Sequence, residues 1–167
     1  MTAYVVQLSR SRGGVPKLAI DEAAVTADGL EGDKQRDRRF HGGPNRALCL
    51  YSDDLIEQLA LEGHPISRGS TGENVTIRGL DWGLVRPGVR LSIGDVHVEI
   101  TSFAAPCKTI RGSFIDADST RVSQKLHRGW SRAYCRILRP GFIRVYDAVA
   151  ILSPADDLFP LSSAIGL

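Results

Sequence analysis

Short apolar runs separated by glycine and proline constrain the fold of this chain more than any other feature of its sequence. The 167 residues include 17 glycines and 8 prolines, which end the apolar runs before they reach the length of a typical helix. Runs of this kind favour β-strands. Tyr4–Leu8 is one of them, and Ala47–Tyr51 carries apolar side chains on both faces, as a buried strand does. The pattern predicts a mostly β fold.

A hairpin is predicted in the middle of the chain. Val89–Ile93 and Val96–Thr101 flank Gly94-Asp95, a dipeptide typical of a tight hairpin turn. In the second arm apolar residues alternate with His97 and Glu99, which predicts one buried face and one wet face.

Four more strands are expected. Ala133–Leu138 and Phe142–Tyr146 flank Pro140-Gly141 and are predicted to pair with each other in an antiparallel manner. Asn74–Ile77 and Ala148–Leu152 have the composition of further strands. Together these runs predict a mostly β domain, a β-barrel with a few peripheral helices.

Two helices are expected on the outside of this barrel. Ser52 has the residue type of an N-cap, and acidic residues follow it in the first turn, where the helix dipole favours them. An apolar stripe then runs from Leu55 to Leu61 and ends before Gly63. Ser119–His127 is predicted to form a second, short helix.

Length and composition are those of one globular domain, residues 1–167. We expect residues 153–167 to form a C-terminal tail or a short helix. No apolar run has the roughly 18–20 residues of a membrane span, and the N-terminus lacks the pattern of a secretory signal. We therefore expect a cytoplasmic protein with no membrane partner. Three cysteines do not make a disulfide framework in such a chain.

The basic residues are clustered. Nine Lys or Arg and only two acids lie between Lys108 and Arg144, so this segment carries +7, whereas the net charge of the chain is +2 and the remainder sums to −5. Such clustering indicates an anionic ligand or partner. Arginines outnumber lysines 17 to 4, which suits bidentate contacts with phosphate or carboxylate but also follows from a GC-rich genome.

Four polar loops are candidates for a binding site. They span Ser11–Lys17, Gly29–Pro44, Gly69–Asn74 and Ala104–Thr109. Glycine-rich loops let backbone N–H groups approach an anion closely. None of the four has the spacing of a Walker loop or of a Rossmann fingerprint.

Cys107 differs from the other two cysteines, because it follows a proline in a loop and precedes Lys108, whereas Cys49 and Cys135 lie in apolar strand patterns. A thiol beside cations has a lowered pKa, and its thiolate is a nucleophile and a metal ligand. From the residues alone, a functional thiol and an ordinary loop thiol remain equally open. His41 lies in a glycine-flanked turn, where ligand, acid–base and structural roles are all open.

Two acids in the second loop have two interpretations. Asp33 and Asp37 are spaced as a carboxylate pair, but acids interleaved with lysine and arginine more often form a solvated salt-bridge network. Zinc has weak support, because no His or Cys pair has the spacing of a structural finger.

Several blocks, taken in order, resemble those of the MOSC domain, named after the C-terminal domain of molybdenum cofactor sulfurases. The blocks are GLEGDKQRDRRFHGGPNRALCLYS, HPISRGSTGENVTIRGLDW, GVRLSIGDVHVEITSFAAPCKTI and RVSQKLHRGWSRAYCRIL. The resemblance covers about residues 13–152 and is greatest to stand-alone bacterial MOSC proteins. It implies a MOSC-like β-barrel that binds the molybdenum cofactor, a pterin dithiolene with a terminal phosphate or nucleotide.

The resemblance also implies an activity. Related proteins reduce N-hydroxylated compounds such as hydroxylaminopurine and amidoximes, a detoxification reaction that takes electrons from a separate reductase. The cysteine of the PC-containing loop, Cys107 here, is the proposed molybdenum ligand. Thiolate suits molybdenum as a soft ligand. We expect His41 to donate a proton to the substrate, with Asp33 as the second candidate.

The cofactor's anionic tail requires cationic groups and N–H donors. We expect the polar loops and the basic segment to supply them. Together with Cys107, the expected cofactor-binding residues are Lys17, Arg38, Arg46, Asn74, Lys108, Arg111, Ser123 and Lys125. Pyridoxal phosphate is not expected on this chain, because the fused domain that carries it in the sulfurase branch is absent from the sequence.

Two other classes of function stay open. One is a non-redox carrier of sulfur or of the molybdenum cofactor, with a persulfide on Cys107. The other is a generic anion-binding module. Aromatic residues make up only 7% of the chain, which argues against nucleic acid as the anion. The physiological substrate, the electron donor and the oligomeric state are not fixed by the sequence.

Overall fold

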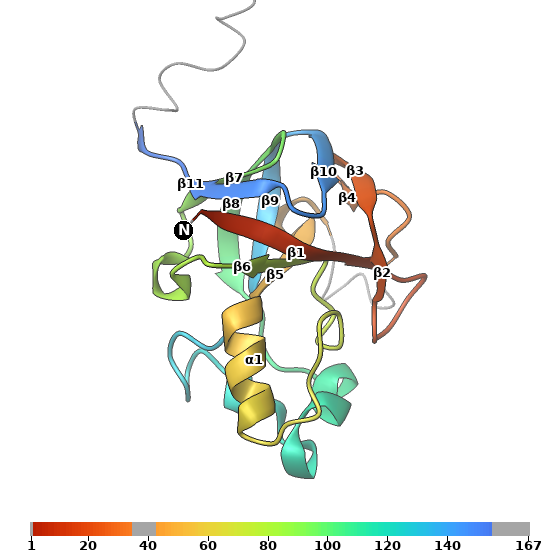
Figure 1. Cartoon of the computed structure of the whole chain (residues 1–167), viewed down its shortest axis with the longest axis vertical. Helices are drawn as coiled ribbons and strands as arrows, with labels where there is room; N and C mark the ends of the chain where they lie inside the picture. The colour runs from red at the N-terminus through yellow and green to blue at the C-terminus, as the bar shows by residue number, and fades with distance from the viewer. Residues whose placement is uncertain (1, 35–42, 155–167) are drawn as a thin grey trace, which may run out of the picture.

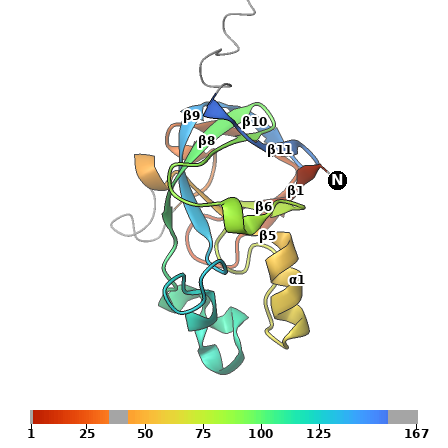
Figure 2. The ribbon, with the colours of Figure 1, turned by 90° about the vertical axis from the view of Figure 1, so that its left-hand side faces the viewer.

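Seven strands form a closed barrel. A computed structural model of the protein describes residues 2–34 and 43–154. In the barrel the neighbours follow the order β11–β7–β8–β9–β5–β6–β1, and β11 pairs back with β1. The seven strands are β1 (Ala3–Arg10), β5 (Leu48–Ser52), β6 (Val75–Arg78), β7 (Arg90–Ile93), β8 (Val96–Phe103), β9 (Ala133–Arg139) and β11 (Ala148–Ile151). The predicted mostly β barrel is confirmed, and Figure 2 shows its strands curving into a ring.

One pair of barrel strands is parallel, and the rest are antiparallel. Leu50 of β5 lies opposite Val75 of β6 in the parallel pair. A parallel pair requires a crossover connection, and here the helix α1 (Asp53–Leu61) lies in that connection. In Figures 1 and 2, α1 and the helical segment between residues 108 and 122 lie at the same end of the barrel.

The predicted hairpin of β7 and β8 is confirmed. Ile93 pairs with Val96 across the turn at Gly94-Asp95. Val96, Val98 and Ile100 are buried, as the alternation predicts, whereas the intervening residues are partly exposed. Apolar side chains from all seven barrel strands form the core.

The second predicted hairpin is wrong. β10 (Gly141–Arg144) does not pair with β9; Phe142 lies opposite Ala24 of β3 (Glu22–Thr26) instead. Only Pro140 separates β9 from β10, whereas a hairpin loop has at least two residues. β10, β3 and β4 (Gly29–Leu30) form a separate three-stranded sheet, and β2 (Leu18–Ile20) extends the barrel sheet beside β1.

Helix α1 begins as predicted. The Ser52 hydroxyl accepts a hydrogen bond from the Leu55 N–H at 3.2 Å, which caps the helix. Ile56 and Leu59 are buried, but Leu61 is 83% exposed, which corrects the predicted stripe. Because an α-helix turns about 100° per residue, Leu61 lies on the face opposite Leu59.

The second predicted helix is much shorter than expected. Within Ser119–His127 only Ser119–Val122 is helical, as a 3₁₀-helix. Ser123 then adopts an extended backbone, and its hydroxyl accepts from the Leu126 N–H at 3.3 Å, which competes with helix continuation. The other 3₁₀-helices are Pro44–Arg46, Trp82–Leu84, Lys108–Ser113 and Ile115–Ala117.

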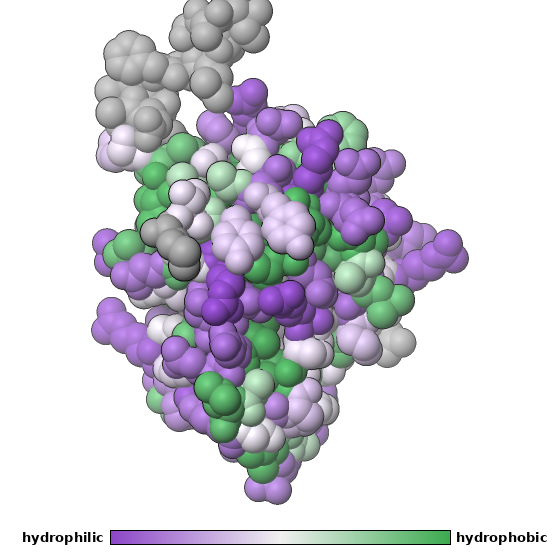
Figure 3. All heavy atoms as spheres, in the orientation of Figure 1, coloured by the Kyte–Doolittle hydropathy of each residue, from purple (hydrophilic) through white to green (hydrophobic). Residues whose placement is uncertain are grey.

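On the face shown in Figure 3, hydrophilic residues surround small apolar patches, and this face carries no broad hydrophobic area. In the described part of the chain, no helix is both long and apolar enough to cross a membrane.

Candidate functional site

A cavity of about 870 Å³ opens where three of the polar loops meet the start of β9. Its size lies in the upper part of the range for ligand sites. Loops Ser11–Lys17, Gly69–Asn74 and Ala104–Thr109 all contribute. The residues that line it are Gly14, Val15, Lys17, Arg46, Cys49, Thr71, Gly72, Phe103, Ala105, Pro106, Cys107, Lys108, Thr109, Ile110, Arg111, Ser119, Thr120, Ser123, Arg132 and Tyr134.

Cys107 is the partly exposed thiol of this cavity. It precedes the 3₁₀-helix Lys108–Ser113, and its Sγ lies 2.7 Å from the Thr109 hydroxyl oxygen. Cys49 also lines the cavity but is only 4% exposed, and burial raises its pKa to about 11. Burial also raises the pKa of Cys135, which lies in the core. Of the three thiols, Cys107 is therefore best placed to react with or bind a ligand.

The cavity wall is strongly cationic. Five of its side chains are basic, and none of the lining residues in the described ranges is acidic. The basic residues are Lys17, Arg46, Lys108, Arg111 and Arg132. Arg46 lies over the ring of Tyr134, with its guanidinium carbon 5.4 Å from the ring centroid. A concave site with this charge attracts anions.

Lys108 and Arg111 are the exposed cations of the wall. In a 3₁₀-helix, residues three apart lie above one another, so both side chains occupy one face, the one that lines the cavity. Neither forms an ion pair with any residue of the described ranges. Their charge is thus available to a ligand.

Asp33 ties the predicted residues Lys17 and Asn74 together. Its carboxylate accepts hydrogen bonds from Lys17 Nζ at 2.7 Å, from Asn74 Nδ2 at 2.9 Å and from the Ser11 N–H at 2.9 Å. Asn74 Oδ1 also accepts from the Cys49 N–H at 3.0 Å. Asp33 and Asn74 lie behind the cavity wall and hold Lys17 within it.

Arg132 joins two of the cavity loops, and the sequence analysis did not single it out. Its Nη1 donates to the Thr71 carbonyl at 2.8 Å and its Nη2 to the Ala105 carbonyl at 3.0 Å. Its Nε is buried without a hydrogen-bond partner among the described residues. The signal available in the sequence was an arginine placed directly before a strongly apolar strand.

The remaining predicted residues are distributed as follows. Ser123 lines the cavity, whereas Lys125 is exposed and does not. Arg38 and His41 lie outside the described residues, and so does Asp37. Among the residues with described positions, no group of three or more His, Cys, Asp or Glu is arranged to hold a metal ion. A metal at Cys107 would therefore need ligands from outside the described residues.

Part of the basic segment is neutralised by acids from elsewhere in the chain. Arg121 Nη2 lies 2.8 Å from a Glu62 oxygen, and Arg136 Nη2 lies 2.6 Å from a Glu99 oxygen. The +7 of this segment thus overstates the charge that a ligand meets.

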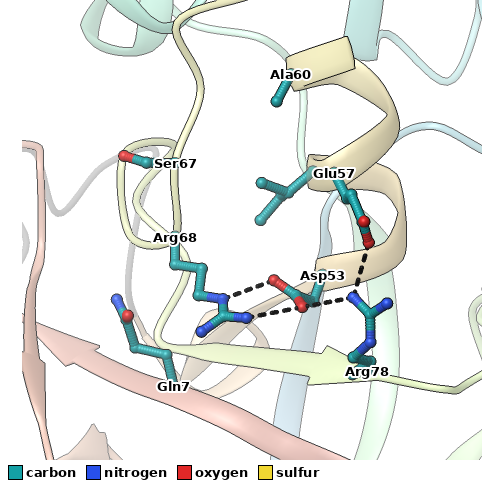
Figure 4. Close-up of a pocket in the computed structure, with 8 residues that line it drawn as sticks. Gln7, Asp53, Glu57, Ala60, Ser67, Arg68 and Arg78 are labelled. Carbon is teal, nitrogen blue, oxygen red and sulfur yellow. Dashed lines mark hydrogen bonds and ion pairs between the residues drawn. The ribbon is translucent and has the colours of Figure 1, made fainter.

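A second cavity, of about 520 Å³, lies beside α1 (Figure 4). Asp53 lies between two arginines there, with its carboxylate 2.7 Å from Arg68 Nε and 3.0 Å from Arg78 Nη1. Arg78 also contacts Glu57 at 2.9 Å. These carboxylates and guanidinium groups pair with one another. Their ion pairs link α1 to β6, so this cavity presents little free charge to a ligand.

The fold and the larger cavity define a mostly β barrel protein with a thiol in a cation-lined site. The model of the MOSC domain matches residues 37–150, and the chain belongs to this family. It is 27% identical to Protein YiiM of Escherichia coli over 154 residues, which cover 86% of this chain and 66% of that protein. It is 28% identical over 129 residues to protein YflK of Bacillus subtilis, covering 75% of this chain and 57% of YflK. The chain thus spans less than two thirds of either relative.

Solved structures share the fold. The structure of YiiM from Escherichia coli matches with a TM-score of 0.69 at 23% identity, covering 92% of this chain and 70% of that one. The YUAD protein from Bacillus subtilis matches with a TM-score of 0.71 at 20% identity, covering 89% of this chain and 94% of that one. These matches support the resemblance to stand-alone bacterial MOSC proteins.

Proposed function

We propose that the larger cavity binds the molybdenum cofactor and that the protein reduces N-hydroxylated compounds, with Cys107 as the molybdenum ligand. The observation that carries this proposal is the partly exposed Cys107 thiol in a cavity with five basic side chains and no acid among the described lining residues. MOSC domains are associated with this cofactor. A separate reductase as electron donor and a cytoplasmic location belong to the same proposal.

The residues of the cavity fit the chemistry of this cofactor. A thiolate is a soft ligand that suits molybdenum, and Cys107 supplies one. The phosphate tail needs cations and hydrogen-bond donors. Arg132 offers a buried Nε with no partner in the described chain, and Lys108 and Arg111 offer unpaired charge.

The glycine at position 72 supports a close approach of the ligand to the backbone. Gly72 has φ +81°, and a Cβ there would lie 3.2 Å from Val15 Cγ1. A larger residue would therefore strain the backbone and crowd the loops that form this wall.

Each residue then has a role that its position supports. Cys107 would bind the metal, and Arg46, Lys108, Arg111 and Ser123 would hold the anionic tail within the wall they form. Lys17 adds charge that Asp33 orients. When bound, the cofactor would supply the centre that passes two electrons to the N–O bond. His41 remains the proposed proton donor, because the Asp33 carboxylate already accepts three hydrogen bonds, one of them from Lys17.

The experiment that tests this function is multiple turnover. Protein from a host that makes the cofactor should reduce hydroxylaminopurine or an amidoxime many times per chain when given a chemical reductant. Cys107→Ser should abolish the reaction, because serine is a harder and less donating ligand. His41→Ala should slow it roughly 10²-fold and leave the molybdenum content unchanged. A single stoichiometric release of cofactor or sulfur would instead identify the protein as a carrier with a Cys107 persulfide.

A further inference from the structure

Glu73 is a carboxyl group buried directly behind the cavity wall. The residue is 0% exposed. One oxygen, Oε1, accepts a hydrogen bond from the Thr71 hydroxyl at 3.0 Å. The other, Oε2, is buried with no hydrogen-bond partner among the described residues. An ionised carboxylate in this position would leave one oxygen without a donor, which is costly in a protein interior.

The groups around Glu73 come from three segments. Thr71, on the same loop, lies in the cavity wall but is itself 0% exposed, and Arg132, directly before β9, lies in the wall as well. Cys49 and Tyr51 of β5 interact electrostatically with the carboxyl, and burial raises the pKa of each. Arg132 is thus the cation that acts most strongly on Glu73, but no hydrogen bond joins the two.

Together, these surroundings favour the protonated, neutral form of the Glu73 carboxyl. Burial raises the pKa of Glu73, and this effect exceeds the opposing effects of Arg132, the Thr71 hydroxyl and nearby backbone N–H groups. A carboxylic acid that keeps its proton can donate a hydrogen bond or a proton.

We propose that Glu73 stores a proton for the reaction in the cavity and delivers it through the hydroxyl of Thr71. This inference rests on the proposed function, because it supplies what the reduction of an N-hydroxylated compound consumes. Glu73 does not touch the substrate itself. It acts on the substrate only through Thr71 and is therefore a positioning residue.

The step balances as follows. R–NH–OH takes up two electrons and two protons, its N–O bond breaks, and R–NH₂ and water form. The electrons come from the partner reductase. At rest the Thr71 hydroxyl donates to Glu73 Oε1, so delivery requires this hydrogen bond to reverse. One proton then passes from the Glu73 carboxyl to the Thr71 oxygen, while Thr71 gives its own hydroxyl proton toward the cavity and the departing oxygen. The hydroxyl of threonine can serve as donor and acceptor in this way. The second proton comes from the proton donor already proposed for the reaction, and solvent reprotonates Glu73.

Arg132 stabilises the negative charge that remains on Glu73 after the proton has left. After the proton leaves, the carboxylate lies near a buried guanidinium whose Nε has no other hydrogen-bond partner in the described chain. Attraction between the two charges in the protein interior stabilises the ionised intermediate state. The site therefore holds a proton at rest and can release it without leaving an isolated buried charge.

Infrared spectroscopy tests the stored proton without any activity. In protein free of cofactor at pH 7, the C=O stretch of a protonated carboxyl should be present and should disappear in Glu73→Gln. In Thr71→Val the band should persist and shift, because its hydrogen-bond partner is lost. Absence of the band from folded wild-type protein would overturn the inference, whatever the activity.

Kinetics tests the delivery. Glu73→Gln and Thr71→Val should each lower kcat about 10²-fold with little change in KM or molybdenum content. In the wild type kcat should fall at high pH, and both variants should lose that fall. Thr76→Val is the matched control, because Thr76 is also fully buried but lies on β6 outside the cavity wall; its kcat should be that of wild type. If both variants keep the wild-type pH profile, the relay is wrong while the proposed function stands. If the wild type turns over no N-hydroxylated substrate, the proposed function fails and the relay with it.

Discussion

Lys17 Nζ lies 2.7 Å from Asp33 Oδ2, and the two side chains are 4% and 6% exposed. This ion pair joins the loop before β2 to the segment after β4, at the wall of the larger cavity. It is buried deeply enough that each charge depends on the other, because removal of one partner of a buried pair leaves an uncompensated charge.

Replacement of Asp33 should therefore destabilise the protein. Asp33→Ala leaves Lys17 buried without its carboxylate and should cost about 3–5 kcal/mol of unfolding free energy. The double variant Lys17→Met with Asp33→Leu should recover most of that loss. Urea unfolding followed by circular dichroism measures both. Equal losses in the single and double variants would show that packing, not the unpaired charge, sets the cost.

The three thiols should differ in reactivity. In protein without cofactor at pH 8, an alkylating reagent should modify Cys107 first, because Cys107 is partly exposed and burial raises the pKa of both Cys49 and Cys135. Mass spectrometry of peptides at successive times gives the order. Cys49→Ala and Cys135→Ala should each cost about 1–2 kcal/mol through small cavities. Faster modification of Cys49 than of Cys107 would reverse our assignment.

The contribution of Glu73 to the stability of the fold should fall as the pH rises. Burial raises the pKa of Glu73 above its ordinary value of 4.5, so above that pH the folded state binds more protons than the unfolded state. The stabilising contribution is complete below pH 4.5 and is lost as the pH rises through the folded-state pKa.

Glu73→Gln, which mimics the neutral acid, should therefore match wild type near pH 4.5 and exceed it at pH 8. Each unit of pKa shift corresponds to about 1.4 kcal/mol. Urea unfolding of both proteins across this pH range gives the difference. A variant less stable than wild type at pH 8 would mean that the carboxylate, not the acid, is the favoured form.

Arg132 should be irreplaceable by lysine. It donates to carbonyls of two loops, and a lysine cannot reproduce that planar fork. Arg132→Leu should cost about 1–3 kcal/mol for each carbonyl that loses its donor, and Arg132→Lys should lower the molybdenum content as well. Arg136→Lys is the control, since this exposed arginine lies on β9, the strand that begins directly after Arg132, and pairs with Glu99 at the surface. Similar effects at both positions would contradict a specific role of Arg132 in the site.

The local pattern of the sequence predicted most of the barrel but not the partner of each strand. The β7–β8 hairpin is correct because both arms and the turn are adjacent in the chain. β10 pairs with β3, more than a hundred residues earlier, and nothing in either strand alone indicates that pairing. Leu61 is exposed, and its place in the predicted stripe is wrong because that prediction did not take account of the angle at which each residue lies around the helix axis.

The candidate site was predictable only where a residue type carried its own chemistry. Cys107 and Lys108 stood out because a loop thiol followed by a cation can carry chemistry, although an ordinary loop thiol was equally open from the residues alone. Arg132 and Glu73 did not, because their importance depends on burial and on contacts with distant loops. The roles of Arg38 and His41 stay predictions, since both lie outside the described residues.

Elemental and pterin analysis tests the central claim most directly. Protein purified from a host that makes the cofactor should contain molybdenum and pterin at about one per chain, because Cys107 and the five cations of the cavity wall suit that ligand. Protein from such a host with neither molybdenum nor pterin above background would contradict the account and leave an anion-binding module as the better description of the cavity.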